Sequence, residues 1–188
     1  MLAKTIRSAL AIALFAVVVP ILLGQEIVHA TIGNLTKVDP ASASLIIRTP
    51  DASTEVFQLK QGLSTRISFD TTLREGSVAP DKLSKGASHI IVYYYGTSPE
   101  TAVSVKELGK RALDVRGVIS HVDKNQHAIT IKTRSGTENT CYLVKDTTVE
   151  TSLGVLDGSK YSPKKGDSVS AVCNEEAGRE TAQFIQSL

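Results

Sequence analysis

Apolar and polar positions alternate in short runs along the chain after residue 30. Leu45 and Ile47 fall on one face of such a run, and Ile129 and Ile131 do the same in a second run. Turn-forming residues follow each run, at 49–52 and at 134–137. Helical periodicity is missing over long segments, so the chain is predicted to be mostly β. Further strands are predicted at 31–38, 54–59, 64–69, 88–95, 101–106, 117–122, 138–144, 168–173 and 181–187.

The strand pattern occurs twice. An offset of 84 positions places Gly33 on Gly117, Leu45 on Ile129 and Arg48 on Lys132, and it keeps the hydrophobic phase. The two copies differ in loop length, which chains tolerate well. The segment 106–116, with mixed charges, is predicted to be a short linker or one helical turn, with the boundary between the copies near residue 112.

Each copy has about 75 residues and five principal strands, whereas an immunoglobulin-type sandwich needs roughly 100 residues. A small five-stranded OB-like barrel fits this length better. Domain 1 is predicted at 31–110 and domain 2 at 113–188. Prolines within 76–86 and 154–166 argue against a long helix between the third and fourth strands, so a loop or one short helical turn is expected there.

The second copy resembles a family of small bacterial secreted domains of unknown function with OB-like barrels, which occur singly or in tandem. The resemblance covers nearly all of 115–188, and the first copy departs from it by extra residues around 58–65. It implies no catalytic residues. The matching segments are Gly117–Asp123, Ile129–Thr133, Gly136, Asp146–Val149, Lys165–Asp167 and Thr181-Ala182.

The first thirty residues have the pattern of a secretory signal peptide. Lys4 and Arg7 precede an apolar run from Ala9 to Leu23, and Val28-His29-Ala30 resembles a cleavage site. An uncleaved anchor is the alternative, but the run is shorter than the roughly 20 residues that a spanning helix needs. The sequence therefore predicts an exported protein, periplasmic or extracellular, with residues 1–30 removed and no membrane span afterwards.

Charge gives little indication of a partner. The chain has 21 Lys and Arg against 19 Asp and Glu, and the predicted mature chain has 19 against 18. A net charge this close to zero gives no strong attraction to nucleic acid or to a membrane surface. The expected partner is an unidentified envelope or extracellular protein or a glycan.

Cys141 and Cys173 are the only cysteines, and both lie in the second copy. Because an exported chain enters an oxidising compartment, we expect them to form a disulfide that stabilises the second barrel. Two buried free thiols are the alternative, since sequence alone does not show that the two β-carbons approach each other.

Catalytic and cofactor motifs are missing. His121 and His127 flank the turn that begins at Asp123, but zinc would need a further protein ligand there, so ordinary solvated positions are expected. No Gly-x-Ser-x-Gly elbow is present. No cofactor, no metal and no enzyme activity are predicted.

Tyr93, Tyr94 and Tyr95 form the one aromatic cluster. OB barrels stack bases or sugars on exposed aromatic rings, which makes Tyr94 a weak ligand-binding candidate. Core packing on one strand face and an interdomain contact on the other is the simpler interpretation. Lys160, Lys164 and Lys165 are predicted to form a solvated basic turn, and the sequon at Asn34 is a common chance match.

These observations favour a non-catalytic binding or structural module that acts outside the cytoplasm. An OB-type binder of oligosaccharide or single-stranded nucleic acid is the alternative, and a hydrolase comes third.

Overall fold

The computed structural model of the protein describes residues 27–39, 41–59, 77–78, 83, 89–96, 99–108 and 112–188. Within these ranges the regular secondary structure is β-strand, apart from one 3₁₀ turn, η3 (Gly158–Lys160). No helix in this part of the chain is long and apolar enough to cross a membrane. The predicted strand at 64–69, most of the predicted leader and most of the segment 76–86 lie outside the described residues.

The first sheet forms barrel 1. Its strand order is β3-β2-β1-β5-β6-β4, and a parallel pairing between β3 and β6 closes it. The strands are β1 (His29–Asp39), β2 (Ser44–Arg48), β3 (Thr54–Leu59), β4 (Ser77–Val78), β5 (His89–Tyr95) and β6 (Thr101–Leu108).

The second sheet forms barrel 2. Its order is β11-β10-β13-β12-β7-β8-β9, and a parallel pairing between β13 and β9 closes it. The strands are β7 (Ala112–Asp123), β8 (Ala128–Thr133), β9 (Glu138–Tyr142), β10 (Thr148–Thr151), β11 (Gly154–Asp157), β12 (Ser168–Glu176) and β13 (Arg179–Ser187).

Both barrels have the same connectivity. In barrel 1, β1 pairs with β2 and β5, and β3 pairs in parallel with β6. In barrel 2, β7 pairs with β8 and β12, and β9 pairs in parallel with β13. A five-strand Greek-key barrel of this kind is the OB fold. The predicted fold class, two tandem OB-like β-barrels, is therefore confirmed. The strands beyond the common five are β4 in barrel 1 and the β10–β11 hairpin in barrel 2.

The repeat seen in the sequence corresponds to a shared backbone feature. A Cβ atom added at Gly33 would lie 2.8 Å from the carbonyl oxygen of Arg48, and one added at Gly117 would collide with the carbonyl oxygen of Lys132. Each glycine therefore allows the first strand of its barrel to approach the second closely.

Two local predictions need correction. The segment 154–166 contains the one-turn helix that was expected, but strand β11 precedes that turn and pairs with β10, which in turn runs parallel to β13. The predicted linker 106–116 is mainly strand, because β6 extends to Leu108 and β7 begins at Ala112. Strand pairing across the sheets extends both elements beyond what local propensity indicates.

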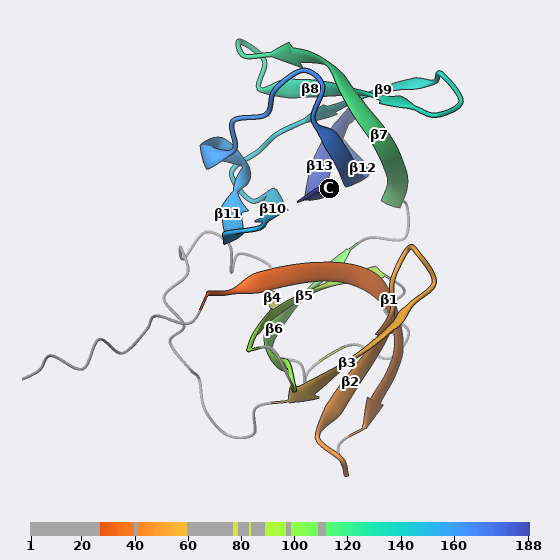
Figure 1. Ribbon diagram of the computed structural model, residues 1–188, viewed down its shortest axis with the longest axis vertical. Coiled ribbons are helices and arrows are strands. Elements are labelled where there is room, and N and C mark those ends of the chain that lie inside the picture. Colours follow the sequence, from red (N-terminus) through yellow and green to blue (C-terminus); the bar gives the residue numbers. More distant parts are fainter. Residues whose placement is uncertain are drawn as a thin grey trace, which may run out of the picture.

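Each barrel has its own buried core, and a third buried cluster joins them. We call this third group the interdomain cluster; Figure 1 shows the two barrels stacked, with β1 crossing the junction beneath β10 and β11. Both barrels contribute apolar side chains that are at most 8% exposed. Its members are Ala30, Ile32, Ile91, Tyr93, Leu108, Val172 and Phe184.

Polar contacts also cross the junction. The Tyr93 and Thr148 hydroxyls lie 2.8 Å apart, and Lys106 Nζ is 3.0 Å from an Asp146 carboxylate oxygen. Lys106 is only 7% exposed, so this ion pair is largely desolvated on the lysine side. These two neighbouring contacts link β5 and β6 of barrel 1 to residues 146–148 of barrel 2.

Candidate functional site

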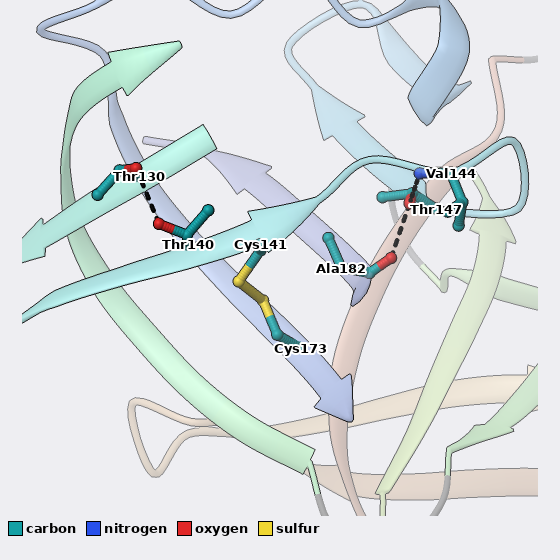
Figure 2. The surroundings of a disulfide bond; sticks show 7 residues. All are labelled: Thr130, Thr140, Cys141, Val144, Thr147, Cys173 and Ala182. Atoms are coloured by element: carbon teal, nitrogen blue, oxygen red, sulfur yellow. Dashed lines mark hydrogen bonds between the residues drawn. A yellow bond between two sulfur atoms is a disulfide. The ribbon is translucent and has the colours of Figure 1, made fainter. Parts of the chain in front are cut away.

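The disulfide predicted between Cys141 and Cys173 is confirmed. Cys141 lies on β9 and Cys173 on β12, both are fully buried, and their Cα atoms are 6.4 Å apart. Figure 2 shows the bond crossing the interior of barrel 2 between these two strands. The strand β13 pairs with both, and Ala182 lies opposite Cys173 in the register. Ala182 belongs to the same buried cluster as both cysteines.

Thr147 connects the loop after β9 to strand β13 by hydrogen bonds. Its hydroxyl donates to the carbonyl oxygen of Ala182 at 2.7 Å and accepts from the backbone N–H of Val144 at 3.0 Å (Figure 2). The residue is completely buried, so both bonds form away from water. Thr147, in the matching segment Asp146–Val149, therefore has a structural role in barrel 2.

One group of possible metal ligands converges within the described residues: Cys141, Cys173 and Glu180, whose ligand atoms lie within 4.8 Å of one another. The two sulfur atoms are bonded to each other and are not available as thiolates. His121 and His127 do not form such a group with Asp123. The Asp123 carboxylate instead accepts hydrogen bonds from the backbone of the hairpin turn.

The tyrosine cluster divides between two environments. Tyr93 is fully buried in the interdomain cluster, and burial raises the pKa of its hydroxyl to about 12. Tyr94 points to the interior of barrel 1, where its ring centroid lies 5.1 Å from that of Phe57 and 5.9 Å from that of His29. Tyr94 is half-buried, and its ligand-binding role stays a prediction.

Among the described residues, three glutamates lie close enough to Tyr94 to affect its pKa, and we call them the junction carboxylates: Glu55, Glu100 and Glu150. Burial is the main cause of the raised pKa of each carboxyl. In Glu150 the hydrogen bonds from His29 and from the N–H of Ala30 oppose that rise. Burial and the three carboxylates together raise the pKa of Tyr94. Carboxyl groups here are therefore protonated more readily than in water.

The outer face of β8 and β9 carries a mixed aromatic and cationic patch. The Arg179 guanidinium lies 5.1 Å from the centre of the Tyr142 ring, and the Tyr142 hydroxyl donates to Gln126 at 3.3 Å. Lys132 is exposed on β8 but lies farther along the strand, opposite Glu138. We call Gln126, Tyr142 and Arg179 the β8–β9 patch. In OB folds this face of the second and third strands is where oligonucleotides and oligosaccharides bind.

The sequence offered one signal for this patch that was missed. Tyr142 follows the inward-facing Cys141, so strand alternation places it on the outer face. Arg179 belongs to a strand whose pairing to β9 is non-local, and its position over the ring is seen only in the structure.

Lys160, Lys164 and Lys165 are exposed, in the 3₁₀ turn and in the loop that follows it. The Asp157 carboxylate accepts from the backbone N–H groups of Ser159 and Lys160, and Asp167 accepts from the N–H of Lys164. These contacts place the basic residues in ordinary capped turns. Asn34, the sequon asparagine, is exposed on β1.

Comparisons with known proteins do not identify a family for the chain. No protein-family model matches the chain, and no curated protein sequence is significantly similar to it. Among solved structures, the chain is similar to one described as Drosophila Unr CSD456, with 13% identity and a TM-score of 0.31. The match covers 85% of this chain and 61% of that one. At this TM-score the similarity carries no argument about function. The resemblance to secreted OB-like domains stays a prediction.

Proposed function

We propose that the protein is an exported, non-catalytic binding module that presents two OB barrels as one rigid unit. The observation that carries this proposal is the interdomain cluster. It uses the strands β1, β5 and β6 of barrel 1 and β12 and β13 of barrel 2. None of its members belongs to β2, β3, β8 or β9, so the outer faces of these strands lie away from the apolar contact between the barrels.

The disulfide supports the exported location. Disulfides persist in oxidising compartments and are rare in the cytosol. A signal-peptide pattern at the start of the chain agrees with this. The proposed partner is an envelope or extracellular protein or a glycan that contacts the outer face of β2–β3 or β8–β9.

Photo-crosslinking in intact cells tests this proposal. A photoreactive residue at Val56, which is 52% exposed, or at Thr140 would report on the two proposed faces. Leu153 is 84% exposed and lies in the β10–β11 turn, so the same residue there is the control. We expect adducts in the exported fraction from the first two positions and not from the third. A cytoplasmic chain, or equal adducts at all three positions, would contradict the proposal.

The β8–β9 patch favours a second candidate function, the binding of an oligosaccharide or a single-stranded nucleic acid. Stacking on an aromatic side chain contributes about 1–3 kcal/mol per base. If Tyr142 stacks on a ligand, Tyr142→Ala should weaken binding by roughly 5- to 150-fold. Thr130→Ala on the same face is the control. Titration with single-stranded oligonucleotides and a glycan array would separate the two ligands.

A hydrolase is the third candidate and the one with the least support. Steady turnover of an ester or glycoside substrate by the purified protein would overturn the non-catalytic assignment.

A further inference from the structure

The segment Ile27–Ala30 belongs to the folded protein, although the sequence pattern places it at the end of the leader. β1 begins at His29 and pairs with β5 from its first residue: His29 lies opposite Tyr94, and Ala30 lies opposite Tyr93. A chain that began at Thr31 would lack the first two of the five residue pairs between β1 and β5.

Backbone and side-chain hydrogen bonds tie this segment to barrel 2. The carbonyl oxygen of Val28 accepts from the N–H of Val155 at 2.9 Å. The N–H of Ala30 donates to one Glu150 carboxylate oxygen at 2.8 Å, and His29 Nδ1 lies 2.6 Å from the other. Glu150 is only 9% exposed, and both of these hydrogen-bond partners belong to the predicted leader. A chain without His29 and Ala30 would lose both of these bonds.

Apolar contacts from the same segment fill the junction. Ala30 is 2% exposed as a member of the interdomain cluster, and Val28 packs against that cluster. A Cβ atom added at Gly154 would lie 2.5 Å from the Ile27 side chain and 2.8 Å from the Val28 carbonyl oxygen. The glycine, at φ +100°, lets the β10–β11 turn approach this segment closely. The turn of barrel 2 therefore fits residues that cleavage after Ala30 would remove.

We propose that the mature protein retains Ile27–Ala30 and that any processing of the leader takes place at or before Glu26. This rests on the proposed export of the protein. The sequence offers a small residue for such a cut at Gly24, which is followed by Gln25 and Glu26. Val28-His29-Ala30 then serves as the first part of β1 and not as a recognition sequence for the peptidase.

Mass spectrometry of the N-terminus of the full-length protein, recovered from exported and cytoplasmic fractions, tests the proposal. An exported chain that starts at or before Ile27, including an uncut chain held at the membrane, supports it. An exported chain that starts at Thr31 overturns it and leaves export intact. A cytoplasmic chain that starts at Met1 instead overturns the proposed function.

A stability measurement gives a second, independent result. Glu150→Met removes both hydrogen bonds to the segment and leaves the N–H of Ala30 buried without its acceptor. If Ile27–Ala30 is retained, we expect the melting temperature of the exported protein to fall by several degrees. If the chain begins at Thr31, the substitution has neither of these hydrogen bonds to remove, and the melting temperature should stay the same or rise. Glu138→Met, at an exposed position on β9, is the matched control.

Discussion

The two barrels join equivalent strands with different chemistry. In barrel 1 the rings of Phe57 and Tyr94 are in contact, whereas in barrel 2 Cys141 and Cys173 are bonded. Phe57 lies opposite Leu45, and Cys141 lies opposite Ile129, the residue aligned with Leu45 in the repeat.

Tyr94 and Cys173 also occupy equivalent positions in the two barrels. Tyr94 lies opposite Ala102 and Cys173 opposite Ala182, and each alanine ends a Glu-Thr-Ala triplet on the strand that closes its barrel. An aromatic contact and a covalent bond therefore occupy the same place in one topology. The comparison teaches that strand pattern specifies the OB barrel, while the link across it can vary.

The largest expected effect tests whether the aromatic contact is the counterpart of the disulfide. Phe57→Ala should lower the free energy of unfolding by about 3–5 kcal/mol, because it leaves a cavity at a fully buried site. Val56→Ala, on the exposed face of the same strand, should cost far less. Urea unfolding measures both. Equal small effects would mean that barrel 1 does not depend on the ring pair.

Loss of the disulfide should affect barrel 2 before barrel 1. Replacing both cysteines with alanine should cost about 3–4 kcal/mol, the loop-closure value for a sequence separation of 32. Hydrogen exchange should then speed up in β8 and β9 more than in β2 and β3. Uniform loss of protection in both barrels would show instead that the junction makes them unfold as one unit.

A smaller effect is expected at the junction between the barrels. Tyr93→Phe removes the hydrogen bond between the Tyr93 and Thr148 hydroxyls, and Thr148 is fully buried. The free energy of unfolding should therefore fall by about 1 kcal/mol. A double-mutant cycle with Thr148→Val measures the coupling between barrels directly. Tyr142→Phe, which removes a bond between exposed groups, is the control. A coupling energy near zero would contradict a fixed arrangement.

The smallest effect concerns pH. Because burial raises the pKa of the junction carboxylates, the folded protein binds protons more readily than the unfolded chain. Their contribution to stability is therefore complete below about pH 4.5 and is lost as the pH rises through the folded-state values. Asp39 and Asp51 act oppositely, since hydrogen bonds lower the pKa of each to about 2, so their contribution is lost as the pH falls from 3.8 toward 2.

Melting temperatures measured between pH 2 and pH 8 would follow both trends. We expect a maximum in the mildly acidic range that becomes flatter when Glu55 is replaced with Gln. A stability that only rises toward neutral pH would show that the junction carboxylates do not control this range.

The features that the sequence predicted correctly are those with a local residue pattern. Alternation at Leu45 and Ile47 and the aligned glycines predicted two β units, and the length of each unit favoured an OB-like barrel, which the strand order confirms. The disulfide was predicted from two cysteines in a chain that begins with a signal-peptide pattern. The β10–β11 hairpin was missed because its strands have four residues each, and β10 is held by non-local pairing to β13. The role of Glu150 is also non-local, since its partners lie 120 and 121 positions away.

The position of the disulfide also determines how the protein responds to mechanical tension. A force that pulls the two ends of the oxidised chain apart can straighten barrel 1 and the outer segments of barrel 2. The residues between Cys141 and Cys173, separated by 32 positions, are bypassed by the covalent bond. Roughly 110 Å of extended chain would stay hidden until a reductant cleaves the bond. In single-molecule stretching, the two barrels of this nearly duplicated protein would therefore lengthen by unequal steps, and reduction would remove the largest difference between them.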